Sequence, residues 1–287
     1  MSAINANETL PPPAMLVHTH IAPTTGWVNL KFRELWEYRE LVFFFVWRDL
    51  KVRYKQTIVG AGWAVIQPIF SMVVFTIIFG NLAKLDSDGV PYAIFSFTAL
   101  VPWSFFVATL TGTAGSMLSN AGMIKKIYFP RLTIPLSEIL SSSVDFGIQF
   151  VVLVVLMLVF KITPTLNVLW LPLFVLLAVV TALGVGLWLA TWNFRFRDIK
   201  YIQGFLIQSW FFITPIVYST SLLDEPWKTL YGLNPMAGVV EGFRWALLGT
   251  SNAPSGMIGY SALAALVILI SGLYQFRRLE RTFADVI

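Results

Sequence analysis

Long apolar stretches, separated by short polar segments, follow one another along most of this chain. Six stretches of roughly 20 or more mainly apolar residues can be read from the sequence, near 57–83, 91–118, 132–160, 166–192, 199–219 and 256–275. Each is long enough to cross the hydrocarbon core of a bilayer as a helix. Pro68, Pro102 and Pro215 fall inside three of them, where proline is expected to kink a helix. The pattern predicts an all-α integral membrane protein with six transmembrane helices.

The segment before the first of these stretches has a different pattern, in which basic and aromatic residues are mixed. Its seven basic residues are Lys31, Arg33, Arg39, Arg48, Lys51, Arg53 and Lys55. An Arg or Lys at the bilayer centre costs about 2.5–3.5 kcal/mol on insertion scales, so this segment suits the membrane surface instead. We expect an amphipathic interface helix and linker over 27–56, preceded by a disordered cytosolic tail over 1–26.

Composition narrows the class further. Hydrophobic residues make up 57% of the 287 residues and charged residues only 12%, whereas a soluble domain has about 25% charged residues. The net charge of +5 is no nucleic-acid footprint, because the basic residues cluster at the ends of the apolar stretches. The chain has no cysteine, and both of its histidines, His18 and His20, precede the first span, which argues against a metal site or a Ser–His pair inside the membrane.

The distribution of basic residues predicts the orientation. If the amino terminus is cytosolic, the segments 1–56, 119–131, 193–200 and 276–287 face the cytosol and contain sixteen of the 20 Lys and Arg residues. This follows the positive-inside rule, and the inverted orientation would violate it. We therefore expect both termini in the cytosol.

Residues 222–250 do not fit a simple span or an ordinary loop. The segment is apolar and aromatic, with a helix start at Asn234-Pro235, a stop at Gly249 and a break at Gly232. It favours a re-entrant pair of short external helices before the last span. An ordinary external loop is the alternative.

Two acidic residues, Glu138 and Asp145, lie within the third stretch. Seven residues apart, they share a helix face with Ser141, Ser142 and Gln149. Acids inside a membrane are candidates for a proton or cation relay. The alternative is that both lie at the wet inner end of the helix, where Glu138 could pair with a basic residue of the turn before it.

Aromatic and amide side chains recur at helical spacing in the first and fifth stretches. They are Trp63, Gln67, Phe70, Tyr201, Phe205, Gln208 and Phe212. Sugar rings pack their C–H faces on aromatic rings, and amides bond their hydroxyls, so these faces could line the path of a polar polymer. The alternative is ordinary packing or contact with lipid. The short basic turn over 119–131 likewise has two interpretations, a helix anchor or a docking site for a soluble partner.

Four separate motifs resemble the membrane subunit of ABC-type exporters of O-antigen and related polysaccharides. They are RDLKVRYKQT (48–57) with Gly60, Trp63 and Gln67-Pro68; KIYFPR (126–131) with 135–137; LNPMAGVVEGFR (233–244) with 247–249; and FRRLE (276–280) with 283–286. The resemblance covers nearly the whole chain after residue 27.

The resemblance implies a type-2 ABC exporter permease in a bacterial inner membrane. It implies a homodimer with two copies of a separate cytosolic ATPase, which would hold ATP and Mg. No cofactor is expected in this chain. Its sequence contains no Gly-Lys pair and hence no P-loop. The substrate would be an undecaprenyl-diphosphate-linked glycan. Arg48, Lys51, Arg53 and Lys55 would contact its diphosphate or inner-leaflet lipid.

Further roles also follow from the resemblance. The turn over 119–131 would be the coupling helix, 195–198 a lesser contact with the ATPase, and the pair over 222–250 a cap on the outer exit. The expected coupling residues are Lys125, Lys126, Tyr128, Phe129 and Arg131. The expected external gate residues are Asn234, Pro235, Glu241 and Arg244.

Other functions stay open on the sequence. Teichoic acid or capsular glycan export would use the same parts. An ion-coupled secondary transporter would need ion-binding groups at the midplane, for which only Glu138 and Asp145 could serve. A membrane enzyme that modifies glycans would need catalytic groups that the sequence does not reveal.

Overall fold

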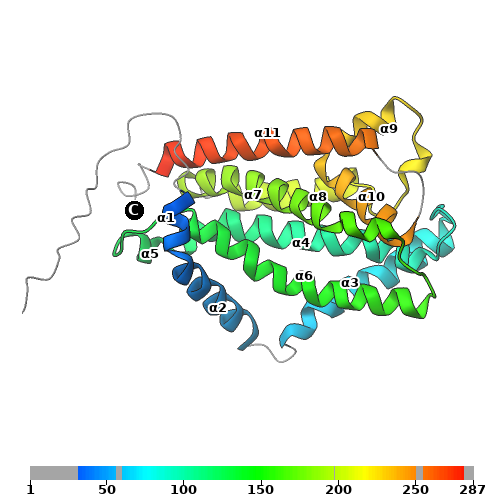
Figure 1. Ribbon diagram of the computed structural model, residues 1–287, viewed down its shortest axis with the longest axis horizontal. Coiled ribbons are helices and arrows are strands. Elements are labelled where there is room, and N and C mark those ends of the chain that lie inside the picture. The colour runs from blue at the N-terminus through cyan, green and yellow to red at the C-terminus, as the bar shows by residue number, and fades with distance from the viewer. Residues whose placement is uncertain (1–31, 56–59, 197, 250–254, 281–287) are drawn as a thin grey trace, which may run out of the picture. The chain divides into compact units, whose positions relative to one another are not determined.

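The computed structural model describes residues 32–55, 60–196, 198–249 and 255–280, and all regular elements in these ranges are helices (Figure 1). The predicted all-α class is confirmed for this part of the chain. The predicted tail over 1–26 and the first residues of the interface segment, 27–31, lie outside the described residues, as do 281–287.

Among the residues that the structure describes, five helices are long and apolar enough to cross a membrane: Gly60–Leu82, Tyr92–Ser119, Thr133–Val159, Leu166–Asn193 and Gly256–Leu279. They agree within a few residues with the predicted stretches, the fifth excepted. The first consists of a 3₁₀ turn, η1 (Gly60–Gly62), then α3 (Trp63–Phe75) and a π-helical end, η2 (Thr76–Leu82). The others are α4 (Tyr92–Ser119), α6 (Thr133–Val159), η3 (Leu166–Trp170) with α7 (Leu171–Arg195), and α11 (Ser255–Glu280).

The predicted fifth span differs from the others. Its helix, α8 (Ile199–Ile213), has 15 residues, and such a helix is roughly 22 Å long, shorter than a hydrocarbon core of about 30 Å. Thr214 is extended, as residues before proline prefer, and Pro215 follows outside the helix. The prediction of a kink at Pro215 is therefore wrong, because this proline lies beyond the end of the helix, whereas Pro68 and Pro102 do lie inside helices.

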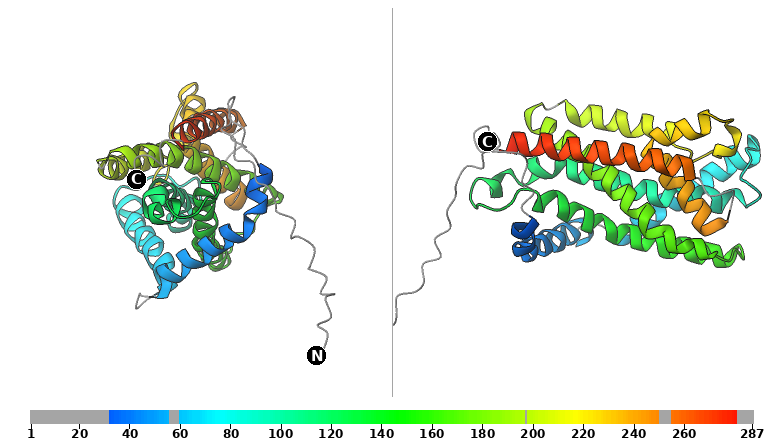
Figure 2. Two further views of the ribbon diagram at one scale, coloured as in Figure 1. Left: turned by 90° about the vertical axis from the view of Figure 1, so that its left-hand side faces the viewer. Right: turned by 45° about the horizontal axis from the view of Figure 1, so that its top comes forward.

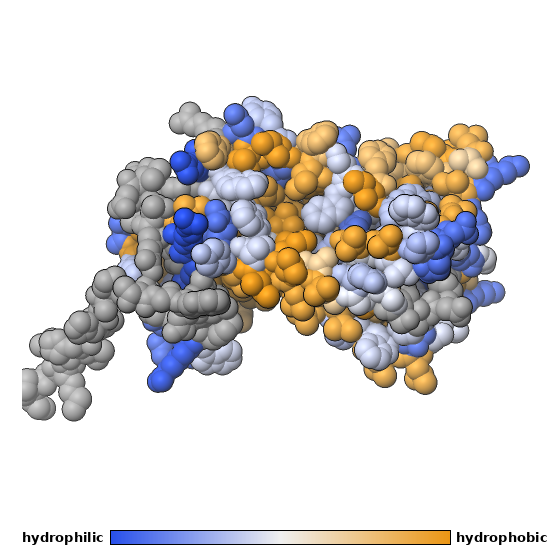
Figure 3. Space-filling view, turned by 90° about the horizontal axis from the view of Figure 1, so that it is seen from above, coloured by the Kyte–Doolittle hydropathy of each residue, from blue (hydrophilic) through white to orange (hydrophobic). Residues whose placement is uncertain are grey.

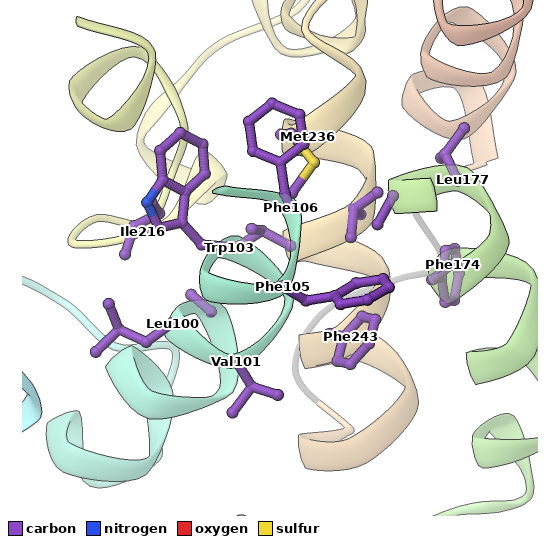
Figure 4. Packing of buried hydrophobic residues seen from close by; sticks show 14 of the residues in the cluster. Leu100, Val101, Trp103, Phe105, Phe106, Phe174, Leu177, Ile216, Met236 and Phe243 are labelled. Carbon is purple, nitrogen blue, oxygen red and sulfur yellow. The ribbon is translucent and has the colours of Figure 1, made fainter. Parts of the chain in front are cut away.

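Helix α4 is the centre of the packing. It contacts α3, α6, α7 and α10 (Pro235–Leu248), and 78% of its most apolar 18 residues are buried. Figure 4 shows Trp103, Phe105 and Phe106 of α4 among residues of α7 and α10. Burial of large aromatic side chains around one helix makes α4 the element against which the others are positioned.

Helices α7 and α11 pack closely side by side, and glycine permits this approach. A Cβ atom on Gly184 would lie 2.8 Å from the Cα of Leu269, and one on Gly272 would lie 2.4 Å from the carbonyl oxygen of Gly184. Small residues of this kind let two helix backbones approach within a membrane.

The short elements gather near the two ends of the long helices. Near one end lie α1 (Phe32–Glu37), α2 (Arg39–Lys55) and α5 (Ala121–Ile124), with α2 running across the direction of the long helices (Figures 1 and 2). Near the other lie η4 (Thr220–Leu222), α9 (Trp227–Leu230), η5 (Tyr231–Leu233) and α10. We call these the basic end and the α9–α10 end.

Apolar side chains remain exposed on several of the long helices. Only 6% of the most apolar 18 residues of the span Gly60–Leu82, and 22% of those of α6, are buried. Figure 3 shows hydrophobic residues over the middle of one face and hydrophilic residues toward its two ends. Exposed apolar surface of this extent needs lipid or another chain to cover it, which fits an integral membrane protein.

Candidate functional site

A cavity of about 740 Å³ lies among α3, α4 and α6, and it brings together residues from three of the predicted groups. Trp63 and Gln67 line it from α3, Arg53 reaches it from the end of α2, and Asp145 lines it from α6. Phe211 of α8 also contributes to the wall. The cavity therefore combines aromatic, amide and charged groups within a mostly apolar bundle, as small-molecule sites commonly do.

Asp145 ties α2 to α6 at the rim of this cavity. Its Oδ2 atom lies 2.5 Å from Nη1 of Arg53, and its Oδ1 atom accepts a hydrogen bond from the hydroxyl of Tyr54. Burial, together with this bond to Asp145, raises the pKa of Tyr54 to about 12, so the hydroxyl stays protonated and remains a donor at physiological pH. Because α2 belongs to the basic end, this contact fits the interpretation of Asp145 as a group at the wet end of its helix.

Glu138 has a different environment from the one that the sequence suggested. It forms no ion pair with Lys125, Lys126 or Arg131 in the part of the chain that the structure describes. Its side chain instead packs against Gly112 of α4, where a Cβ atom would lie 2.4 Å from Oε2 of Glu138. The glycine provides the space that this carboxyl group occupies beside the cavity.

The aromatic and amide faces predicted on α3 and α8 point outward. Phe70 is 68% exposed, and Tyr201, Phe205 and Phe212 are each more than 60% exposed. Gln67 and Gln208 are exposed with them. These faces are free to meet lipid, a second copy of the chain or a substrate, and they contribute little to the core.

Other aromatic residues of α8 point inward and hold this helix to the bundle. The ring of Phe211 lies 5.8 Å from that of Phe75 and 5.6 Å from that of Trp103, and Trp210 lies 5.1 Å from Phe106. Phe211 and Phe212, which are adjacent in sequence, thus have opposite roles. Helical spacing alone did not distinguish the packing face of α8 from its exposed face.

The predicted coupling turn contains a short helix of four residues, α5. Lys125, Lys126 and Tyr128 are exposed, and Arg131 is half-buried. Phe129 is 4% exposed, and its ring lies 5.9 Å from that of Phe45 in α2. Phe129 is therefore an anchor for the turn, while the two lysines and Tyr128 form its outer surface.

The four basic residues predicted to meet a lipid diphosphate divide into two kinds. Arg48 is held within the chain, by Asn120 Oδ1 at 2.8 Å and by Asp49, and Arg53 pairs with Asp145. Lys51 and Lys55 are exposed, with the Lys51 ammonium 4.3 Å from the ring centre of Trp47. The two arginines fix α2 to the bundle, whereas the two lysines are presented outward.

The predicted external gate residues do gather at one place, around the end of α8. Asn234 caps α10 through Met236 N, and its Oδ1 accepts a 2.7 Å bond from Trp210 Nε1 of α8. Pro235 is the first residue of α10, and Gly249 ends it in the left-handed conformation, as the sequence predicted. The helical break falls at Asn234, two residues after the predicted Gly232, because the asparagine cap starts the new helix.

Arg244 is fully buried and closes this arrangement. Its guanidinium donates to the carbonyl oxygens of Pro215 at 2.7 Å and Ile216 at 2.8 Å, pairs with Glu241 at 2.9 Å, and lies 3.5 Å from the ring centre of Phe95. The arginine thus satisfies backbone carbonyls that the extended segment after α8 leaves without helical partners. Glu241 and Arg244 had been singled out only through the family resemblance, and their pairing was not predicted from the sequence.

Several contact residues were missed from the sequence. Tyr54, Asn120 and Phe95 hold the elements just described; Tyr54 lay in the first family motif and Asn120 in the predicted coupling turn, but no role had been predicted for any of the three. Ser142 and Gln149 had been placed on the face of Asp145, and both line the cavity. No group of three or more potential metal ligands occurs among the described residues.

Comparisons with known proteins agree on one family. The ABC-2 type transporter family matches residues 40–248. An O-antigen export system permease protein RfbA of Klebsiella pneumoniae is 31% identical over 242 residues, 84% of this chain and 92% of that protein. The RfbA of Myxococcus xanthus is 29% identical over 260 residues, 89% of this chain and 98% of that protein.

A more distant relative is named for a different substrate. The polysialic acid transport protein KpsM of Escherichia coli is 21% identical over 234 residues, 81% of this chain and 91% of that protein. The family match covers all the elements from α2 to α10, and with them the cavity, the coupling turn and the Arg244 cluster. This chain is therefore a member of the ABC-2 type transporter family of membrane proteins.

Proposed function

We propose that this protein is the membrane subunit of an ATP-driven exporter that moves lipid-linked polysaccharide of the O-antigen type across the bacterial inner membrane. The observation that carries the proposal is the pair of outward aromatic and amide faces on α3 and α8, in a chain whose relatives are named as O-antigen export permeases. Aromatic rings and amides suit a sliding sugar polymer, since each contact is weak and repeated.

In this proposal two copies of the chain form the conduit between them. The faces of α3 and α8 are the natural candidates for its lining, because they have aromatic residues exposed and are not needed for the core. The segment over 199–219 makes the fifth of six crossings, with α8 extended by the backbone after Thr214. The pair α9 and α10 dips into the outer leaflet, where Arg244 satisfies the broken backbone.

The basic end faces the cytosol, and both termini lie there. The excess of Lys and Arg at this end supports the orientation through the positive-inside rule. Lys125, Lys126 and Tyr128 on the turn after α4 then meet a separate ATPase, of which two copies serve the dimer and hold ATP and Mg. Contacts of Phe129 with Phe45 and of Arg48 with Asn120 would pass movement of this turn to α2.

The lipid carrier's diphosphate is assigned to the cytosolic surface of α2. Lys51 and Lys55 are the better candidates among the four basic residues, because both arginines have partners within the chain. Contact of the lysines with anionic inner-leaflet lipid is the simpler alternative.

Capsular glycan or teichoic acid is the alternative substrate, and the relative named for polysialic acid transport favours the former. An ion-coupled secondary transporter is less well supported, because Asp145, one of its two candidate ion ligands, already pairs with Arg53.

Site-specific photo-cross-linking in exporting cells tests the proposal. A photoreactive residue in place of Phe70 or Phe212 should form adducts with the glycan. The adducts are detected by electrophoresis, because the attached glycan slows the migration of the protein. The control is the same residue at Val267 of α11, which is 58% exposed and apolar but lies on neither face. Glycan adducts at Val267 as abundant as those at Phe70 and Phe212, or none at any position, would contradict the conduit.

A further inference from the structure

The α6 side of the cavity carries two buried polar atoms that nothing in the described chain satisfies. Ser142 Oγ and Gln149 Oε1 have no hydrogen-bond partner, and the two residues are 0% and 6% exposed. Both line the cavity, and their spacing of seven places them on one face of α6. Ser137 and Ser143 on the same helix donate to carbonyls of their own helix at 2.8 Å, whereas Ser141 Oγ also has no partner but does not line the cavity. Ser142 is thus available to a group inside the cavity.

The charges at the rim of the cavity balance each other. Arg53 and Asp145 form an ion pair with one another, and the Tyr54 hydroxyl donates to the same carboxylate. No net charge is left on these three side chains to select an anion or a cation. The ligand that such a cavity suits is therefore neutral and bears groups that donate hydrogen bonds to an amide oxygen and a hydroxyl.

The remaining walls supply flat aromatic surface. Trp63 and Gln67 come from α3, Trp103 from α4 and Phe146 from α6, so rings and a second amide line the same cavity as the two polar atoms. The volume of about 740 Å³ is in the range of small-molecule sites. Hydroxyl groups directed at amide and serine oxygens, with C–H faces against aromatic rings, are the features of a sugar ring.

We infer that this cavity is a side pocket that binds one or two neutral sugar units, through hydrogen bonds from their hydroxyls to Gln149 Oε1 and Ser142 Oγ. Trp63 and Gln67 join the pocket to the α3 face, so the inference rests on the proposed glycan conduit and adds a second contact beside it. The pocket would hold a sugar of the glycan next to the basic end while the rest of the polymer lies along the outward faces.

The test measures binding of a neutral trisaccharide, maltotriose, to the purified protein in nanodiscs. Saturation-transfer NMR detects the binding. The test variant combines Gln149→Leu with Ser142→Ala. The matched control combines Gln203→Leu with Ser141→Ala, because those residues are also buried on α8 and α6 but do not line the cavity. An acidic trisaccharide of sialic acid tests the charge argument.

The wild type and the control should bind maltotriose, and the test variant should bind it about tenfold more weakly, the factor expected for one or two lost hydrogen bonds. The acidic sugar should not compete. Equal binding by both variants, competition by the acidic sugar, or no binding by the wild type would overturn the pocket. If the test variant does not fold, Ala108→Leu, which fills the cavity from α4, replaces it with the same expected loss.

A parallel assay separates this inference from the proposed function. Cells that contain the wild-type protein and the partner ATPase should export glycan. This expectation does not depend on whether the pocket binds maltotriose. If export occurs but maltotriose binding does not depend on the pocket residues, the assignment of the sugar site is refuted and the exporter assignment stands. Pocket-dependent binding without export would leave the pocket in place and remove the exporter assignment.

Discussion

Among single residues, the buried and half-buried ion pairs of this protein hold different elements together. Arg53 and Asp145 join α2 to α6, and Arg244 with Glu241 joins α10 to the segment after α8. The two pairs differ in burial, because Arg244 and Glu241 are almost wholly enclosed while Arg53 is partly exposed. Loss of one partner should therefore have different consequences at the two places.

The substitution Asp145→Asn should loosen α2 from α6. It removes an ion pair and weakens the acceptor of the Tyr54 hydroxyl, which should lower the free energy of unfolding by about 1–3 kcal/mol. Thermal unfolding in detergent measures this. The control Glu37→Gln breaks the exposed pair of Arg33 and Glu37, at 3.4 Å, and should cost less than about 1 kcal/mol. Equal effects of the two changes would contradict the role of Asp145 in holding α2 to α6.

The substitution Arg244→Met should have a larger effect. It leaves Glu241 buried without its partner and the carbonyls of Pro215 and Ile216 without their donor, a loss of about 3–5 kcal/mol. Adding Glu241→Gln should recover part of the loss, because the unpaired charge is then removed. A double-mutant cycle measured by thermal unfolding tests this, and simple additivity would refute the pairing.

At the scale of helices, close contact depends on residues without side chains. Gly184 and Gly272 allow α7 and α11 to pack backbone to backbone. Gly259 lies on α11 as well, yet a Cβ atom there would meet nothing within 4 Å. Glycines in one helix thus differ sharply in what they permit.

The substitution Gly184→Ala should separate α7 from α11. The added methyl group meets backbone atoms of Leu269, which cannot move aside as a side chain can, so a cost of about 1–3 kcal/mol is expected. Gly259→Ala should be neutral or stabilising by up to about 1 kcal/mol, because alanine favours the helix. Thermal unfolding of both variants in detergent decides the point, and similar losses in both would be inconsistent with the contact.

The helices were predictable to different degrees for physical reasons. The length of α4, α6, α7 and α11 follows from the hydrocarbon thickness, and the sequence therefore located them within a few residues. The end of α8 was not located, since Pro215 can either kink a helix or follow its last residue, and tertiary contacts of Arg244 decided between them. The partners of Asp145 and Arg48 likewise depend on how α2 packs, which local pattern does not encode.

At the scale of the whole molecule, the two ends have different tasks. The basic end presents the turn with Lys125 and Lys126, while the α9–α10 end is closed by the Arg244 cluster. The sequence predicted both regions, the first from charge and the second from the caps at Asn234 and Gly249. It did not predict the cavity, which forms where α3, α4 and α6 meet and therefore depends on long-range packing.

The combined substitution Lys125→Glu and Lys126→Glu should uncouple ATP hydrolysis from export. If this turn docks onto the ATPase as proposed, reversing its two exposed charges should repel the accepting surface and lower export by a factor of about ten or more. Lys84→Glu with Lys161→Glu reverses two exposed charges at the other end and should leave export unchanged. Glycan at the cell surface, measured with membrane insertion of the protein as reference, checks both, and unimpaired export in the first variant would remove the coupling assignment.

In the proposed function, this chain is a glycan conduit powered by a separate ATPase. Inside-out inner-membrane vesicles test it directly, because export there becomes glycan accumulation in the lumen. With the ATPase present, accumulation should require hydrolysable ATP and should survive collapse of the proton gradient. Accumulation that needs the proton gradient and proceeds without the ATPase would contradict the account.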